Sequence, residues 1–204
     1  MEELVVETET VFNKGESEET WEDMLNCLKK WTSFFENSKE VEKRGKDKEK
    51  MLGLIRRFCN CLCIVFQSER GQLCINGCDV VMNLCSWQMQ IKSSVQLLDE
   101  NVATILIPSL VNLSTRANKV FVRKAHETIS ILVTAIVESN HQGSSICISK
   151  TLHLLSISLT NKNKLTRLAV ATAIQALLLH LTVSHDIFVD SISNSVYMVQ
   201  FQFF

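Results

Sequence analysis

Apolar residues recur along most of the chain at the three- and four-residue spacing of an amphipathic helix. This pattern predicts helices over residues 21–35, 48–67, 73–87, 99–113, 119–137, 144–159 and 164–181, with an eighth beginning over 187–199. The chain has only 6 Gly and 1 Pro. Strand-rich folds need many turn residues, so we expect an all-α protein with short connections.

The two ends of the chain differ from the helical middle. Residues 1–18 are acidic and form either a tail or a weak helix, since Leu4, Val5, Val6, Val11 and Phe12 supply a short apolar face. Residues 36–50 are a charged linker. Residues 19–204 are expected to form one domain.

The predicted helices pair, and the pairs repeat at intervals of about 45 to 49 residues. The dipeptide Asn118-Lys119 recurs as Asn163-Lys164, each just before an aligned helix. The pattern predicts an α-α superhelix, a solenoid of the HEAT or armadillo kind, with its intra-repeat turns in a row along one edge. The aligned columns are Leu73, Val120 and Leu165; Cys78, Ala125 and Val170; Met82, Ile129 and Ile174; and Cys85, Leu132 and Leu177.

Composition and charge limit the classes of function that the chain can have. With 204 residues, 46% hydrophobic and 21% charged, the chain has a globular composition. Its net charge of −1 argues against nucleic-acid binding, which needs many cations to neutralise phosphates. The charge is uneven, however: residues 1–23 are acidic, and most cations come later, often at predicted helix starts. A local basic edge is therefore expected.

The 8 cysteines occupy apolar positions of the helical pattern, which favours core packing in a reducing, cytoplasmic compartment. Cys59, Cys61 and Cys63 alternate, so on a helix they point apart and do not form a zinc site. We expect no cofactor. The apolar run 168–185 contains six polar residues, two of them histidines, which favours a buried helix over a membrane span.

Several features invite an enzymatic interpretation without supporting it. His126 and Glu127 are adjacent, and four further histidines are scattered along the chain. They are accompanied by no nucleophile motif, phosphate-binding glycine loop or paired carboxylates. The sequence therefore predicts a protein without catalytic activity.

Four segments at or near the predicted turns form an ordered pattern: Thr20–Glu22, Ser68–Arg70, Leu106–Leu113 followed by Asn118–Val120, and Thr160–Asn163 followed by Arg167. Over residues 19–185 this pattern resembles TOG domains, most closely those of the CLIP-associated protein (CLASP) family. The family has six repeats, whereas this pattern stops within a fifth, so we expect an incomplete TOG domain, as in a fragment or isoform.

This resemblance implies binding of αβ-tubulin or microtubules, and of other cytoskeletal proteins, in the cytoplasm at the spindle, cell cortex or cilium. A tryptophan would insert against an apolar patch, while basic and amide side chains would contact acidic tubulin. The residues that match these roles are Trp21, Arg70, Asn118, Lys119, Lys162, Asn163, Lys164 and Arg167.

Each of these residues also has a purely structural interpretation. Trp21 could pack on Phe34 or a neighbouring helix, and the cations could be ordinary solvated charges. Asn118 and Asn163 are typical helix N-caps, with partner contact as a second role. An alternative function is a HEAT or armadillo scaffold that binds a different protein in its concave groove.

Overall fold

The computed structural model describes residues 1–37, 48–91, 96–139 and 145–183, and in these ranges the regular structure is entirely α-helical. The predicted helix at 187–199 and most of the charged linker lie outside the described residues. The helices are α1 (Glu2–Phe12), α2 (Trp21–Asn37), α3 (Lys48–Gln67), α4 (Gly71–Gln90), α5 (Glu100–Ser114), α6 (Lys119–Glu138), α7 (Ser145–Ser158) and α8 (Lys164–Val183).

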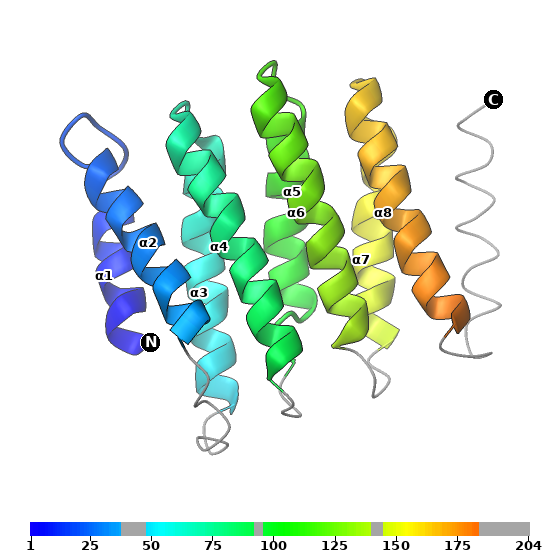
Figure 1. Cartoon of the computed structure of the whole chain (residues 1–204), viewed down its shortest axis with the longest axis horizontal. Helices are drawn as coiled ribbons and strands as arrows, with labels where there is room; N and C mark the ends of the chain where they lie inside the picture. Colours follow the sequence, from blue (N-terminus) through cyan, green and yellow to red (C-terminus); the bar gives the residue numbers. More distant parts are fainter. Residues whose placement is uncertain (38–47, 92–95, 140–144, 184–204) are drawn as a thin grey trace.

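Within the described part of the chain, consecutive helices form four hairpins that stand side by side in two layers (Figure 1). The odd-numbered helices α1, α3, α5 and α7 pack in sequence to form one layer. The even-numbered helices α2, α4, α6 and α8 form the other layer. Each hairpin therefore contacts its neighbours through both of its helices, and the core is a continuous apolar seam between the layers.

Aromatic side chains fill the seam at its N-terminal end. The ring of Trp31 stacks on Phe58 with a centroid distance of 3.9 Å, and Trp87 lies 5.3 Å from Phe35. Both tryptophans are buried, as predicted. Among the described helices, none is long and apolar enough to cross a lipid bilayer.

The aligned repeat columns are buried at most positions, but not at the first. Leu73 is buried, whereas Val120 and Leu165 are 48% and 54% exposed. The reason is the helix start: Leu73 is the third residue of α4, but Val120 and Leu165 are the second residues of α6 and α8. The third positions of α6 and α8 are Phe121 and Thr166, which are buried.

Residues 2–12, for which the sequence allowed a tail or a helix, form α1. Val5, Thr8 and Phe12 are its buried face. Its acidic side is paired with the next hairpin, since Arg57 Nε donates to Glu9 Oε1 at 2.8 Å. This hydrogen bond lowers the pKa of Glu9. The acidic N-terminus is thus an integral element of the stack.

Candidate binding edge at the hairpin turns

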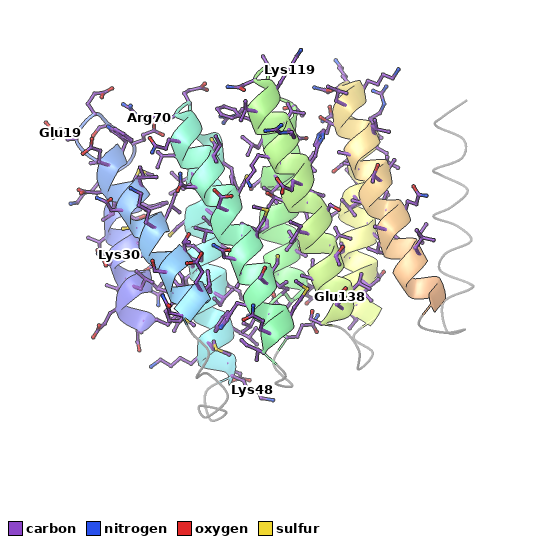
Figure 2. All side chains as sticks on the ribbon, viewed as in Figure 1. Glu19, Lys30, Lys48, Arg70, Lys119 and Glu138 are labelled. Atoms are coloured by element: carbon purple, nitrogen blue, oxygen red, sulfur yellow. The ribbon has the colours of Figure 1, made fainter. Side chains whose placement is uncertain are left out.

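The four connections within the hairpins lie along one edge of the stack, which we call the turn edge (Figure 1). They comprise residues 13–20, 68–70, 115–118 and 159–163. Arg70 and Lys119 lie at this edge, while Lys48 and Glu138 lie at the opposite one (Figure 2). Because α4, α6 and α8 all begin at this edge, their N-terminal residues are presented together.

Arg70 and Trp21 are in contact with each other. The guanidinium carbon of Arg70 lies 4.9 Å from the centroid of the Trp21 ring, a cation–π distance. Arg70 Nε also lies 3.2 Å from Glu16 Oε1, and its Nη2 donates to Glu18. Arg70 is therefore paired with carboxylates of its own chain. Trp21 is partly buried against the core.

The 13–20 connection is held by its own hydrogen bonds. Thr20 Oγ1 donates to Gly15 O at 2.7 Å and accepts from Ser17 N at 2.9 Å. Gly15 has a φ of 77°, a left-handed conformation that suits glycine. These contacts place Glu16 and Glu18 beside the start of α4.

Asn118 and Asn163 are N-caps, as one interpretation of the sequence predicted. Asn118 Oδ1 accepts from Val120 N at 2.9 Å, and Asn163 Oδ1 accepts from Leu165 N at 2.9 Å. Each cap is followed by a lysine at the first helical position, Lys119 or Lys164, and both lysines are exposed. A cation there opposes the helix dipole, which favours negative charge at the N-terminus.

Lys162 and Arg167 differ although both belong to the predicted site. Arg167 Nη1 donates to the carbonyls of Asn161 and Lys162 at 2.7 and 3.0 Å, so its guanidinium is engaged in holding the α7–α8 turn. Lys162 is exposed. Within the described residues, no ion pair is recorded for Lys119, Lys162 or Lys164.

Arg116 is a turn residue that the sequence pattern did not single out. Its Nη2 donates to Phe66 O at 2.8 Å, its Nη1 donates to Ser68 O, and the guanidinium lies 5.8 Å from the Phe121 ring. Arg116 thus joins the 115–118 turn to the end of α3. Its position in a turn gives no periodic signal by which it could have been recognised.

A buried threonine provides a similar link further along the turn edge. Thr166 Oγ1 donates to Ser114 O at 3.1 Å, and both residues are buried. This bond ties the start of α8 to the end of α5. Neighbouring turns are therefore fastened to each other as well as to their own helices.

The cysteines are built into the core. All are buried except Cys63, which is partly buried. Burial raises the pKa of Cys61 and of Cys147 to about 11, and that of Cys78 to about 12. These thiols are protonated near neutral pH, whereas nucleophilic attack and metal binding need the thiolate.

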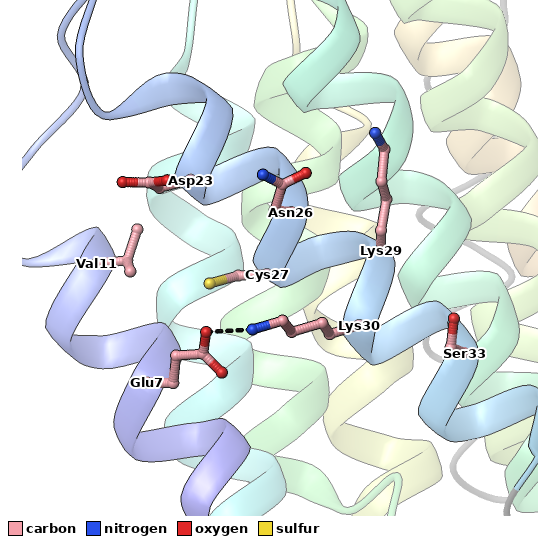
Figure 3. A pocket seen from close by; sticks show the side chains of 8 residues that line it. All are labelled: Glu7, Val11, Asp23, Asn26, Cys27, Lys29, Lys30 and Ser33. Carbon is pink, nitrogen blue, oxygen red and sulfur yellow. Dashed lines mark hydrogen bonds and ion pairs between the residues drawn. The ribbon is translucent and has the colours of Figure 1, made fainter.

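An open groove runs between α1 and α2 on the first hairpin (Figure 3). Most of the residues that line it are polar or charged, with both signs of charge, and an ion pair between Glu7 and Lys30 crosses it. The lining residues are Glu7, Val11, Asp23, Asn26, Cys27, Lys29, Lys30 and Ser33.

Comparison of the chain with models of protein families, with curated proteins and with solved structures found no match. Function is therefore inferred from the geometry of the turn edge and from the turn-residue resemblance.

Proposed function

We propose that this chain is a HEAT-repeat module of the TOG type that binds αβ-tubulin through the turn edge. Three exposed lysines on two consecutive turns support this function: Lys119, Lys162 and Lys164. Such a row of cations complements an acidic protein surface, which speeds encounter and fixes register. Tubulin is the acidic partner that the TOG resemblance implies.

The strongest support for this function is the lysine that recurs at the first position of two helices. A cation at a helix N-terminus lowers stability by about 0.3–1 kcal/mol relative to an acidic side chain, which the helix dipole favours there. Lys119 and Lys164 both follow an asparagine cap in matching positions. A feature that costs stability twice in matching positions is better explained by partner binding than by folding.

The N-terminal half of the turn edge has a different character. Arg70 is already paired with Glu16 and Glu18, and Trp21 is partly covered by Arg70. We therefore assign the primary contact to the α5–α6 and α7–α8 turns, and a secondary contact to Trp21 and Arg70.

A binding assay with charge-matched variants tests this function. The edge variant combines Lys119→Ala, Lys162→Ala and Lys164→Ala. The control removes three lysines away from the turn edge, Lys29, Lys48 and Lys150. Both lose three charges, but only the edge variant should lose binding to free αβ-tubulin, by tenfold or more at low salt in our expectation. Arg167 is left intact because it holds a turn.

Two results would contradict this function. If the edge variant keeps its wild-type affinity while its circular dichroism shows a folded chain, the turn edge is not the binding surface. If the control variant loses binding instead, tubulin contacts a surface away from the turn edge, such as the concave groove of the scaffold alternative.

A further inference from the structure

The 13–20 connection brings acidic side chains onto the same turn edge that is proposed to bind an acidic partner. Glu16 and Glu18 both contact the guanidinium of Arg70. The side chains of Arg70 and Glu16 are only 30% and 25% exposed, so this contact is partly shielded from solvent. Arg70 in turn lies over the ring of Trp21. These four residues therefore form one cluster, and we call its two carboxylates, Glu16 and Glu18, the acidic latch.

We propose that Glu16 and Glu18 are an autoinhibitory element that occupies Arg70 and Trp21 until an acidic partner displaces it. The inference rests on the proposed function and specifies how that binding edge is regulated. A carboxylate of the partner and a carboxylate of the latch compete for the same guanidinium. Because the latch belongs to the same chain, its effective concentration is high and it lowers the apparent affinity.

The local backbone is suited to both a closed and an open latch. Thr20 and Ser17 bond within the connection and hold its carboxylates toward Arg70. Gly15, whose carbonyl accepts the Thr20 bond, has no atom beyond its chain neighbours within 4 Å of the position its Cβ would take. The connection is therefore not packed against the rest of the described chain at this glycine, and glycine has the backbone freedom that opening requires.

The same segment offers a matched control for the charge of the latch. Glu19 and Glu22 are exposed and lie within six residues of Glu16. Among the described residues, no ion pair to either carboxylate is recorded. Neutralising Glu19 and Glu22 changes the net charge by the same amount as neutralising the latch, but leaves Arg70 paired.

The experiment compares the full chain with Glu16→Gln/Glu18→Gln and with Glu19→Gln/Glu22→Gln. Equilibrium affinity for free αβ-tubulin is measured at low salt, together with hydrogen exchange of residues 13–21 in the unbound chain. Partly exposed ion pairs are weak, so the latch variant should bind about three- to tenfold more tightly than the control variant. Its 13–21 amides should also exchange faster than those of wild type.

Each result decides a separate point. Equal affinities of the two variants for tubulin would overturn the latch while leaving the binding function intact. If none of the chains binds tubulin, that function fails, and the same comparison is made with poly-L-glutamate as the acidic probe. Tighter binding of poly-L-glutamate by the latch variant than by the control supports the latch, whereas equal binding, or none, overturns it.

Discussion

The indole nitrogen of Trp31 donates a 2.9 Å hydrogen bond to the hydroxyl of Thr8, and both side chains are buried. The bond joins α1 to α2. Thr8→Val removes the acceptor with little change in shape, and a buried donor left without a partner costs about 1–3 kcal/mol. We expect the free energy of unfolding to fall by that amount, as measured by urea denaturation followed by circular dichroism.

Thr10 supplies the control for this prediction. Thr8 Oγ1 also donates to Leu4 O, one turn back, at 2.6 Å, and Thr10 Oγ1 donates in the same way to Val6 O, but Thr10 is exposed. Thr10→Val should change stability by less than about 0.5 kcal/mol. Equal losses from the two substitutions would mean that the contact between Thr8 and Trp31 contributes nothing specific.

Gly77 allows α3 and α4 to approach closely. A Cβ at this position would lie 2.7 Å from Val65 Cγ1 and 3.1 Å from Phe66 Cε1. Gly77→Ala should therefore destabilise the fold by about 1–3 kcal/mol through overpacking. Gly53 is also in a helix but has nothing within 4 Å of its Cβ position. Gly53→Ala should stabilise by about 0.5–1 kcal/mol because alanine is the better helix former.

Thermal and urea unfolding of the two alanine variants check this pair. Opposite signs are the essential expectation. A stabilising or neutral Gly77→Ala would show that Val65 and Phe66 shift without cost, contrary to the tight packing inferred here.

The helices were predictable because their boundaries carry chemical signals. The predicted starts at 48, 119 and 164 are the observed starts of α3, α6 and α8. Asn118 and Asn163 mark two of them through their capping bonds. The first aligned column is exposed at Val120 and Leu165 because a shift of one residue at the helix start decides which side chain points into the core. Apolar spacing alone does not fix that shift.

The pairing of the turn edge could not be predicted from local pattern. Arg70 and Glu18 are 52 residues apart in sequence, and Arg116 lies 50 residues from Phe66. Which cation meets which carboxylate or carbonyl depends on how the hairpins stack. Sequence therefore identified Lys119, Lys162 and Lys164 as turn cations, but not that Arg70 is held by acids of the first turn.

His126 should make stability depend on pH. Burial lowers the pKa of His126, and its buried Nε2 has no hydrogen-bond partner among the residues that the structure describes. The unfolded chain takes up this proton near the ordinary histidine pKa of about 6.5, while the folded chain resists it. Stability is thus greatest above that pH and falls as the pH is lowered through and below it. We expect His126→Leu to reduce this loss between pH 7.5 and 5.5, measured by urea denaturation at each pH. An unchanged pH dependence would assign the loss to other groups.

Arg116 should be a stabilising residue of the turn edge. Its guanidinium donates to Phe66 O and Ser68 O, the carbonyls at the end of α3. Cations are favourable at that end of a helix, and hydrogen bonds from charged groups contribute about 1.5–3 kcal/mol. Arg116→Met should therefore destabilise by roughly 1–3 kcal/mol, since the site is partly exposed.

Arg123→Met, at an exposed position of α6, should cost less than about 0.5 kcal/mol in the same urea assay. Equal effects would mean that the two carbonyl contacts do not stabilise the turn.

Charge reversal at Lys119 and Lys164 distinguishes a role in binding from a role in folding, because stability and tubulin affinity are expected to change in opposite directions. Each lysine opposes the dipole of its helix, so Lys119→Glu/Lys164→Glu should raise the free energy of unfolding by about 0.3–1 kcal/mol per site. The same substitutions place carboxylates where an acidic partner is proposed to dock, so tubulin binding should weaken by more than the tenfold expected for neutral replacement. Lys119→Gln/Lys164→Gln should lie between wild type and the glutamate variant in both measurements.

A glutamate variant that is more stable and binds as well as wild type would show that these lysines do not contact the partner. Simple unfolding cannot produce the expected result, because stability and affinity are predicted to change in opposite directions.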